Sequence, residues 1–424
     1  MHGRINYLSP NYLVWRFFAR IIFFVGRAFN YTVGWRFSEL DSFSLGYEPL
    51  CGHDAPMNPL RFSILSLAFL FAVSAIAQQP AARLDRANLL QYRDVTGAVQ
   101  PVKTKDDWLK RRAEILRGMQ EVMGPLPGEN RRVPLDLKIE EETDIAAEGY
   151  IRRKITYVAD ATERTPAYLC IPKAVLTGKA KAPAILCLHP TDNKFGNKVV
   201  VGLGGRENRQ YAAELARRGY VTIAPAYPQL ADYWPNLVRL GYESGTMKAI
   251  WDNIRALDLL ASLPFVDTSR GFGAVGHSLG GHNSIYTAVF DERIKVISSS
   301  CGFDSYLNYY DGAEANWFFN RGWCQPRYMP RLSNYRGRLE TIPYDFHELL
   351  GALAPRVFIV NAPIGDSNFR WKSVDDCAKA ATAIYSLHGV GKNLIIRHPD
   401  CAHDFPDAER EAAYKAFDGV LKPN

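Results

Sequence analysis

The sequence predicts an α/β fold in which a mostly parallel β-sheet carries helices on both faces. After Lys181, short apolar runs alternate with amphipathic segments, a pattern typical of parallel strands connected by helices. One apolar run leads directly into a Gly-x-Ser-x-Gly sequence that a helical pattern follows. The composition, 47% hydrophobic and 22% charged, is that of an ordinary globular chain.

The individual elements follow from apolar spacing and from turn residues. A helix is predicted over residues 104–122, and a pair of strands joined by a polar turn over 150–158 and 164–171. Further strands are predicted at 182–189, 220–226, 271–275, 294–299, 356–361 and 393–397. Further helices are predicted at 208–218, 244–263, 283–290, 374–387 and 407–421. Residues 303–341 are rich in aromatic residues, Asn, Arg and Gly, and we expect them to form an insertion over one end of the sheet, either a lid or a packed loop.

The N-terminal region contains a targeting pattern that begins at Met57. A basic start is followed by an uncharged stretch and by Ala75-Ile76-Ala77, which is the pattern of a secretory signal peptide. An uncleaved membrane anchor is the alternative, although the apolar run is short for a membrane span. We therefore expect cleavage after Ala77, a periplasmic or secreted protein without a stable membrane span, and a non-native leader at 1–56. Residues 78–148 would be a lead-in segment and 149–424 the catalytic domain.

Charge and cysteine content exclude several classes of protein. The net charge of +7 is scattered along the chain, so we expect no nucleic-acid partner. Seven cysteines occur without any Cys-x-x-Cys pair, and their spacing to histidines predicts no zinc site. We expect no metal and no cofactor. Cys301–Cys324 and Cys377–Cys401 are possible disulfides, but the sequence does not define the pairing. It does not define the oligomeric state either.

The Gly276-His277-Ser278-Leu279-Gly280 segment is the strongest candidate for a catalytic site. An apolar strand enters it and a helix leaves it, which is the arrangement of a nucleophile elbow. Glycines flank the serine because the turn is tight. The Leu279 N–H lies at the start of the helix, where it can stabilise an oxyanion.

A serine hydroxyl needs a base, and the base needs an acid that orients it. In a strand–elbow–helix arrangement the acid and then the histidine follow the serine along the chain. Asp366 follows the strand at 356–361, and His403 lies in the loop after the strand at 393–397. We therefore predict Ser278, Asp366 and His403 as a catalytic triad. The alternatives are His398 as the base and Asp304, Asp375 or Asp376 as the acid.

Further site residues are predicted around the elbow. The second oxyanion donor should follow the strand that ends at Leu188. Because Pro190 has no N–H, Thr191 is the predicted donor. His277, Trp317 and Trp323 are candidate substrate contacts, although the aromatic residues of the insertion could instead form a small core under a long loop.

With these residues in place, the chain resembles the α/β-hydrolase superfamily, in the branch of acetyl xylan esterase-like, dienelactone hydrolase-like and prolyl oligopeptidase-like domains. The resemblance covers about 150–424. It is carried by the segments at 186–190, 218–225, 276–281, 354–356 and 403–406. It implies an exported serine carboxylesterase acting on a small-molecule or polysaccharide ester, such as an acetyl or feruloyl ester of a plant polysaccharide.

The chain also departs from individual members of that branch. Ser278 stands where dienelactone hydrolases use cysteine, and residues 78–140 are too short for the propeller of prolyl oligopeptidases. His189-Pro190 replaces the commoner His-Gly of the oxyanion loop. A prolyl oligopeptidase-like peptidase and an inactive hydrolase-fold binding protein are the alternative functions.

Overall fold

The computed structural model describes residues 31–34, 46–49 and 83–422, apart from 161 and 179. The chain divides into two units, Met1–Pro80 and Ala81–Asn424. In the first unit, β1 (Tyr31–Gly34) pairs antiparallel with β2 (Gly46–Pro49). The predicted signal peptide lies outside the described residues. None of the described helices combines the length and the apolar character needed to cross a bilayer.

The second unit is built on one nine-stranded sheet in the order β13-β12-β11-β10-β8-β9-β7-β6-β5. The six strands from β13 to β9 are parallel, whereas β7, β6 and β5 are added antiparallel. The strands are β5 (Lys138–Ile145), β6 (Tyr150–Asp160), β7 (Glu163–Pro172), β8 (Ala182–Leu188), β9 (Val221–Pro225), β10 (Val266–His277), β11 (Ile294–Ser300), β12 (Val357–Asn361) and β13 (Leu394–Arg397).

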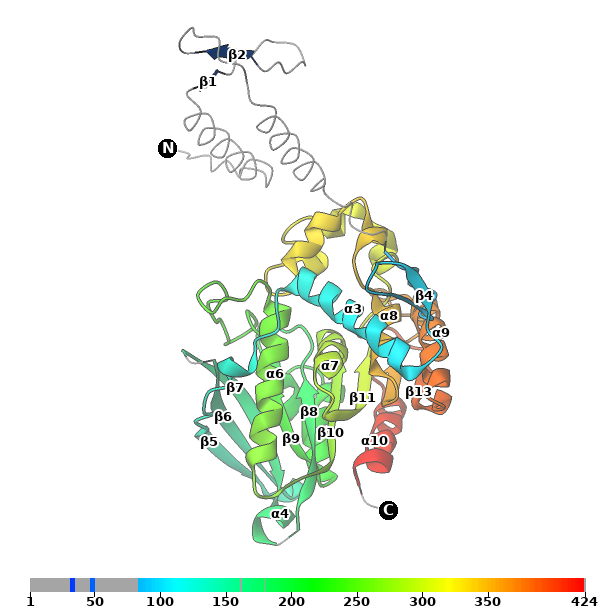
Figure 1. The fold of residues 1–424 in the computed structure, drawn as a ribbon. Coiled ribbons are helices and arrows are strands. Elements are labelled where there is room, and N and C mark those ends of the chain that lie inside the picture. Colours follow the sequence, from blue (N-terminus) through cyan, green and yellow to red (C-terminus); the bar gives the residue numbers. More distant parts are fainter. Residues whose placement is uncertain (1–30, 35–45, 50–82, 161, 179, 423–424) are drawn as a thin grey trace. The chain divides into compact units, whose positions relative to one another are not determined.

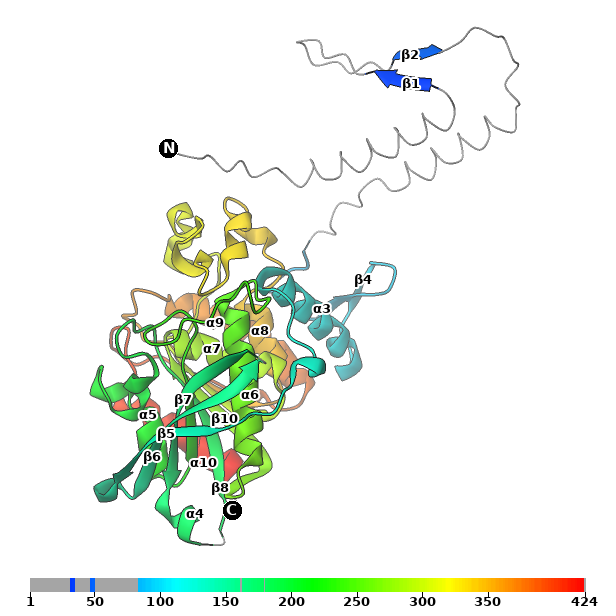
Figure 2. The ribbon, with the colours of Figure 1, turned by 90° about the vertical axis from the view of Figure 1, so that its left-hand side faces the viewer.

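Helices cover both faces of this sheet, as the sequence predicts (Figures 1 and 2). One face packs against α6 (Gly245–Ser262) and α7 (Leu279–Phe290), and the other against α5 (Tyr211–Arg217) and α10 (Asp407–Leu421). The central strand β8 is apolar on both sides. Ala184 and Leu186 belong to one core, and Ile185 and Cys187 to the other. A strand buried on both faces needs this continuous apolar run.

The residues before the sheet belong to the same compact unit. A small hairpin of β3 (Gln91–Arg93) and β4 (Val99–Pro101) precedes α3 (Lys105–Met123). The N-terminus of α3 is stabilised by a capping box between Thr104 and Asp107. Trp108, Ile115 and Met119 of α3 are buried in the main core. The lead-in segment is therefore packed against the rest of this unit.

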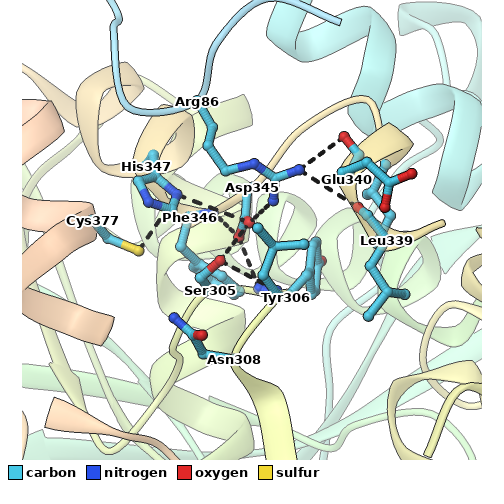
Figure 3. Close-up of polar contacts among 12 residues, drawn as sticks. Arg86, Ser305, Tyr306, Asn308, Leu339, Glu340, Asp345, Phe346, His347 and Cys377 are labelled. Atoms are coloured by element: carbon cyan, nitrogen blue, oxygen red, sulfur yellow. Dashed lines mark hydrogen bonds and ion pairs between the residues drawn. The ribbon is translucent and has the colours of Figure 1, made fainter. Parts of the chain in front are cut away.

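The predicted insertion consists of short 3₁₀ turns, from η5 (Tyr309–Gly312) to η9 (Leu339–Thr341). Asp345 anchors it, as Figure 3 shows. The Asp345 carboxylate accepts the Ser305 hydroxyl at 2.7 Å and the Tyr306 N–H at 3.0 Å, pairs with Arg86, and caps α8 (Phe346–Leu353). One buried carboxylate thus joins the insertion, the helix α8 and the segment that contains Arg86.

The six cysteines in the described part of the chain are free thiols. The structure therefore forms neither of the two pairings that the sequence left open. Five of these thiols are buried, and Cys401 is half-buried. Buried free cysteine acts as a small apolar residue, so these side chains contribute packing.

Candidate active site

Ser278 stands on a sharp turn between β10 and α7. Its φ of 54° and ψ of −121° are strained for a residue with a side chain. The turn requires its glycines because a Cβ on Gly276 would lie 2.1 Å from the Gly280 backbone, and one on Gly280 would lie 1.9 Å from the Leu188 carbonyl oxygen. The predicted elbow geometry is therefore present, at the carboxyl end of β10, the neighbour of the central strand β8.

Backbone hydrogen bonds hold the elbow in place. The Ser278 N–H donates to the Ser300 carbonyl of β11 at 2.7 Å, and the His282 N–H donates to the Ser278 carbonyl at 3.0 Å. The helix α7 begins at Leu279, four residues earlier than predicted. The first N–H groups of a helix have no partner within it, so the Leu279 N–H has the position expected of an oxyanion donor.

Asp366 and His403 face each other in the loops after β12 and β13. The His403 Nδ1 lies 3.0 and 2.9 Å from the two Asp366 carboxylate oxygens. The N–H groups of Asn368 and Phe369 donate to Asp366 at 2.8 and 3.2 Å, which fixes its carboxylate. The Asp366 side chain is 1% exposed and that of His403 22%. The His403 ring centroid lies 4.8 Å from that of His277, the residue before Ser278.

The rival histidine is engaged elsewhere. His398 contacts the Ala362 carbonyl through Nδ1 at 2.8 Å and the Asp375 carboxylate through Nε2 at 2.9 Å. Both of its ring nitrogens are occupied by these contacts, and Asp375 is paired with it. Neither residue therefore has the contacts expected of a triad member.

Asp304, the acid after β11, is enclosed. It is 2% exposed, accepts the Arg370 N–H at 3.0 Å, and has one carboxylate oxygen without a partner. Burial, with smaller contributions from the Asp345 and Asp366 carboxylates, raises the pKa of Asp304 well above its usual value. Its burial favours the neutral form of Asp304, whereas a triad needs an ionised acid.

The oxyanion loop contains the predicted Thr191 and the supporting His189. Thr191 is exposed, and its hydroxyl lies 3.1 Å from that of Tyr328. The His189 Nε2 accepts the Tyr227 N–H at 2.9 Å, and its Nδ1 lies 2.8 Å from the Pro190 carbonyl oxygen. Burial lowers the pKa of His189 to about 4. His189 is thus a neutral group that shapes the loop.

The three predicted substrate contacts are all buried. His277 is 2% exposed and its Nδ1 lies 2.9 Å from the Ser300 hydroxyl; burial lowers its pKa well below the usual value. Trp317 is 1% exposed inside the insertion. Trp323 is 7% exposed and stacks on His282 at 4.3 Å. Trp317 and Trp323 belong to the main hydrophobic core, and all three side chains are largely covered by protein.

Residues that the sequence did not reveal surround the histidine loop. Arg209 pairs with Asp404 at 2.6 Å, and Asn208 donates to the same carboxylate at 2.8 and 3.0 Å. Cys301 is 2% exposed and donates its thiol to the Asp404 carbonyl at 3.2 Å. Burial, followed by the charge of the Asp366 carboxylate, raises the pKa of Cys301 well above its usual value. These contacts join distant positions, so no local pattern could have indicated them.

The chain is similar to known hydrolases and esterases. Residues 233–389 match the family model described as glucuronyl esterase, fungi. The chain is 25% identical over 295 residues to YtaP of Bacillus subtilis, which is named as a hydrolase. The match covers 66% of this chain and 89% of YtaP. It is 25% identical over 198 residues to 4-O-methyl-glucuronoyl methylesterase 1 of Wolfiporia cocos, covering 41% of this chain and 45% of that protein.

Solved structures share most of the fold. A glucuronoyl esterase from Solibacter usitatus superimposes with a TM-score of 0.63 at 20% identity, over 82% of this chain and 100% of that one. One from Caldicellulosiruptor kristjansonii gives 0.58 at 17% identity, over 79% and 90%. The fold and the elbow define the chain as a member of the α/β-hydrolase superfamily. Within that superfamily, the part of the chain that follows β9 is similar to the glucuronyl esterases.

Proposed function

We propose that this α/β-hydrolase is a serine carboxylesterase that cleaves esters of plant polysaccharides. It is an enzyme of the class that hydrolyses carboxylic esters. The observation that supports a working site most strongly is the pair of Asp366 and His403, 2.9 Å apart beside a strained serine elbow. Neighbouring parallel strands bring these groups to one edge of the sheet, where ligands of α/β folds bind.

The proposed mechanism is acyl transfer through Ser278. His403 removes the hydroxyl proton as the oxygen attacks the ester carbonyl, and Asp366 orients the imidazole and stabilises its charged form. The N–H groups of Leu279 and Thr191 would hold the oxyanion. His403 then protonates the departing alcohol, and water releases the acid by the same steps in reverse.

We propose glucuronoyl esters as the first substrate class to examine. The family model that matches residues 233–389 and the Wolfiporia cocos relative both bear that activity in their names. This refines the expectation of an acetyl or feruloyl ester. In this reading the acyl group is the uronic acid of the polysaccharide, and the leaving group is the alcohol esterified to it.

The exposed aromatic residues of the insertion are the proposed sugar contacts. Tyr310, Phe318 and Phe319 are 42, 47 and 64% exposed. The Tyr310 hydroxyl lies 3.2 Å from the Asn368 side-chain oxygen, and the Asn368 N–H donates to Asp366. Tyr310 is therefore linked through one residue to the proposed triad, and its open ring can stack on a sugar.

An ester panel tests the proposal. Methyl glucuronate esters, acetyl-xylan, feruloyl sugars and short aryl acetates are compared on the wild-type protein and on Ser278→Ala. We expect turnover of the glucuronate ester by the wild-type protein and a loss of at least about 10⁴-fold in kcat in the variant. His403→Gln should be inactive and His398→Gln active. Turnover that persists in Ser278→Ala would rule out Ser278 as the nucleophile.

Two other functions are tested alongside. A peptidase would cleave peptide anilides faster than aryl acetates. Residues 83–137 form a hairpin, a helix and a short 3₁₀ turn, which together are far smaller than a propeller. An inactive binding protein would be folded yet fail to react with a fluorophosphonate probe. Labelling of the wild-type protein but not of Ser278→Ala would exclude the second alternative.

We also propose that translation starts at Met57 and that the protein is exported and cleaved after Ala77. The signal-peptide pattern at 57–77 supports this. N-terminal sequencing of the exported protein should begin at Gln78. A mature protein that retains residues 1–56 would contradict the proposal.

A further inference from the structure

Three side chains with metal-binding atoms converge beside the elbow from three loops. Cys301 follows β11, Asp366 follows β12 and His403 follows β13, and one ligand atom from each lies within 4.8 Å of the other two. We call them the Cys–Asp–His cluster. Within the ranges that the structure describes, no other group of three or more His, Cys, Asp or Glu residues is found to meet this condition. The proposed mechanism uses Asp366 and His403 but leaves Cys301 without a role.

We propose that the Cys–Asp–His cluster binds Zn²⁺ and that the bound zinc inhibits the enzyme. Thiolate, imidazole and carboxylate are the ligands that zinc takes in proteins, and three protein ligands leave a fourth position for water. Zinc–ligand bonds of about 2.0–2.3 Å in a tetrahedral site separate the ligand atoms by roughly 3.5 Å. The cluster therefore has to contract by little more than about 1 Å.

The fold holds the thiol at this position. Cys301 has a φ of 49°, which is unusual for a residue with a side chain, and its N–H donates to the Asn361 carbonyl at 2.8 Å. Cys301 and Asp366 are buried, whereas His403 is partly open to solvent. A metal ion could therefore reach the cluster from the histidine side and find the thiol and the carboxylate already enclosed.

Binding exchanges one proton for the metal. The thiol proton, now donated to the Asp404 carbonyl, passes to water as the sulfur–zinc bond forms, and no oxidation occurs. Zinc binds the neutral imidazole, so the proton on His403 Nδ1, which faces Asp366, moves to Nε2 as Nδ1 and the carboxylate bind the metal. With Nε2 protonated and the orienting carboxylate bound to zinc, the imidazole cannot serve as the base. This inhibition rests on the proposed function, whereas the binding does not.

Cobalt(II) gives a test that needs no activity. Titration of the metal-free protein with Co²⁺ should produce a sulfur-to-cobalt charge-transfer absorption at one ion per chain, which Zn²⁺ removes by competition. Cys301→Ser should lose this absorption. Cys401→Ser, a half-buried free thiol two residues from His403, is the matched control and should keep it. Ser278→Ala should also keep it. No absorption in the wild-type protein, or an unchanged one in Cys301→Ser, would overturn the site.

Inhibition is measured on the same proteins, each against its own metal-free rate. Zn²⁺ should inhibit the wild-type protein, and a chelator should restore activity. Cys301→Ser should require at least ~10-fold more Zn²⁺, since even groups that only orient a metal ligand contribute about 10–100-fold to affinity. Equal sensitivity in both proteins would contradict the inhibitory role. If no ester is hydrolysed at all, the proposed function fails, and the cobalt absorption still decides the metal site.

Discussion

Asp366 and Asp304 are two aspartates that follow adjacent strands and lie in different surroundings. Asp366 accepts two backbone N–H groups and faces His403. Asp304 accepts a single N–H, and its burial raises its pKa well above the usual value. Different surroundings give two carboxyl groups different roles. Asp366 is placed to stabilise an imidazolium, whereas burial favours the neutral form of Asp304, which cannot do so.

Replacing each of these aspartates by asparagine therefore has opposite expected results. Asp366→Asn should lower kcat by about 10³–10⁴-fold, because asparagine favours the wrong tautomer of His403. Asp304→Asn should keep kcat within about 3-fold, because it replaces a neutral carboxyl by a neutral amide of the same shape. Steady-state kinetics on the best ester of the panel measures both. A larger loss in Asp304→Asn would make it the functional acid.

His282 predicts a pH dependence of stability. Both of its ring nitrogens are buried without a partner, and burial lowers its pKa to about 3. The unfolded chain, with a pKa near 6.5, therefore binds the proton more readily between pH 6.5 and 3, so the folded state loses stability as pH falls through this window.

His282→Phe should remove this linkage. The ring lies between Tyr286 and Trp323 at centroid distances of 4.1 and 4.3 Å, a stack that phenylalanine can maintain. Between pH 7 and 5 the wild-type free energy of unfolding should fall by about 2 kcal/mol more than that of the variant. Urea unfolding at the two pH values measures the difference. Equal losses would show that His282 does not titrate on unfolding.

At the scale of elements, the loop after β13 is held by the residues just before α5. Asp404, next to His403, accepts bonds from Asn208 and Arg209, and Arg209 is 4% exposed. The Arg209 guanidinium also lies 3.5 Å from the His403 carbonyl oxygen. The position of the proposed base thus depends on a segment almost two hundred residues earlier in the chain.

Arg209→Gln should therefore misplace His403 without touching the substrate. We expect kcat to fall by about 10–100-fold with KM nearly unchanged, because small displacements of a catalytic group are costly. Arg206→Gln changes an exposed arginine three residues earlier and is the matched control. Steady-state kinetics of both variants distinguish a role of Arg209 in positioning His403 from a direct contact with substrate. A higher KM with unchanged kcat in Arg209→Gln would indicate a substrate contact instead.

The predictability of each element follows from its burial. The apolar pattern predicts the strands β8, β9 and β12 almost to their ends, because they are buried and mostly apolar. The strand β5 was missed because it is an exposed edge strand with the sequence KIEEETDI. The helix α8 was missed because it is buried on every side and has no polar face to reveal a helical period.

The same reasoning applies to the site. The order of strands predicted that Asp366 and His403 would meet, since each follows its own parallel strand. Trp317 was expected to face a substrate, but only packing decides which aromatic side chains of an insertion are covered. Cys301 and Arg209 lie far from His403 in sequence, so their contacts with its loop depend on sheet register and loop conformation, which no local pattern encodes.

At the scale of the whole molecule, residues 81–148 stabilise the catalytic part of the chain. Five apolar side chains of α3 are buried in the main core: Trp108, Ile115, Met119, Val122 and Met123. In addition, Arg111 pairs with Glu348 of α8 at 2.9 Å, with side-chain exposures of 3 and 0%. Arg83 also pairs with Glu348, at 2.7 Å.

A chain that begins at Gly149 should therefore not fold, whereas one that begins at Gln78 should fold and be fully active. Burial of each large apolar side chain contributes about 1.5–3 kcal/mol, so the five of α3 together are comparable with a typical net stability of about 5–15 kcal/mol. Removing α3 would also leave the Glu348 carboxylate buried without Arg111 and Arg83, which costs several kcal/mol more. Circular dichroism and thermal unfolding of the two chains measure the effect. Cooperative unfolding of residues 149–424 alone, at the melting temperature of the longer chain, would show that α3 packs against the sheet without stabilising it.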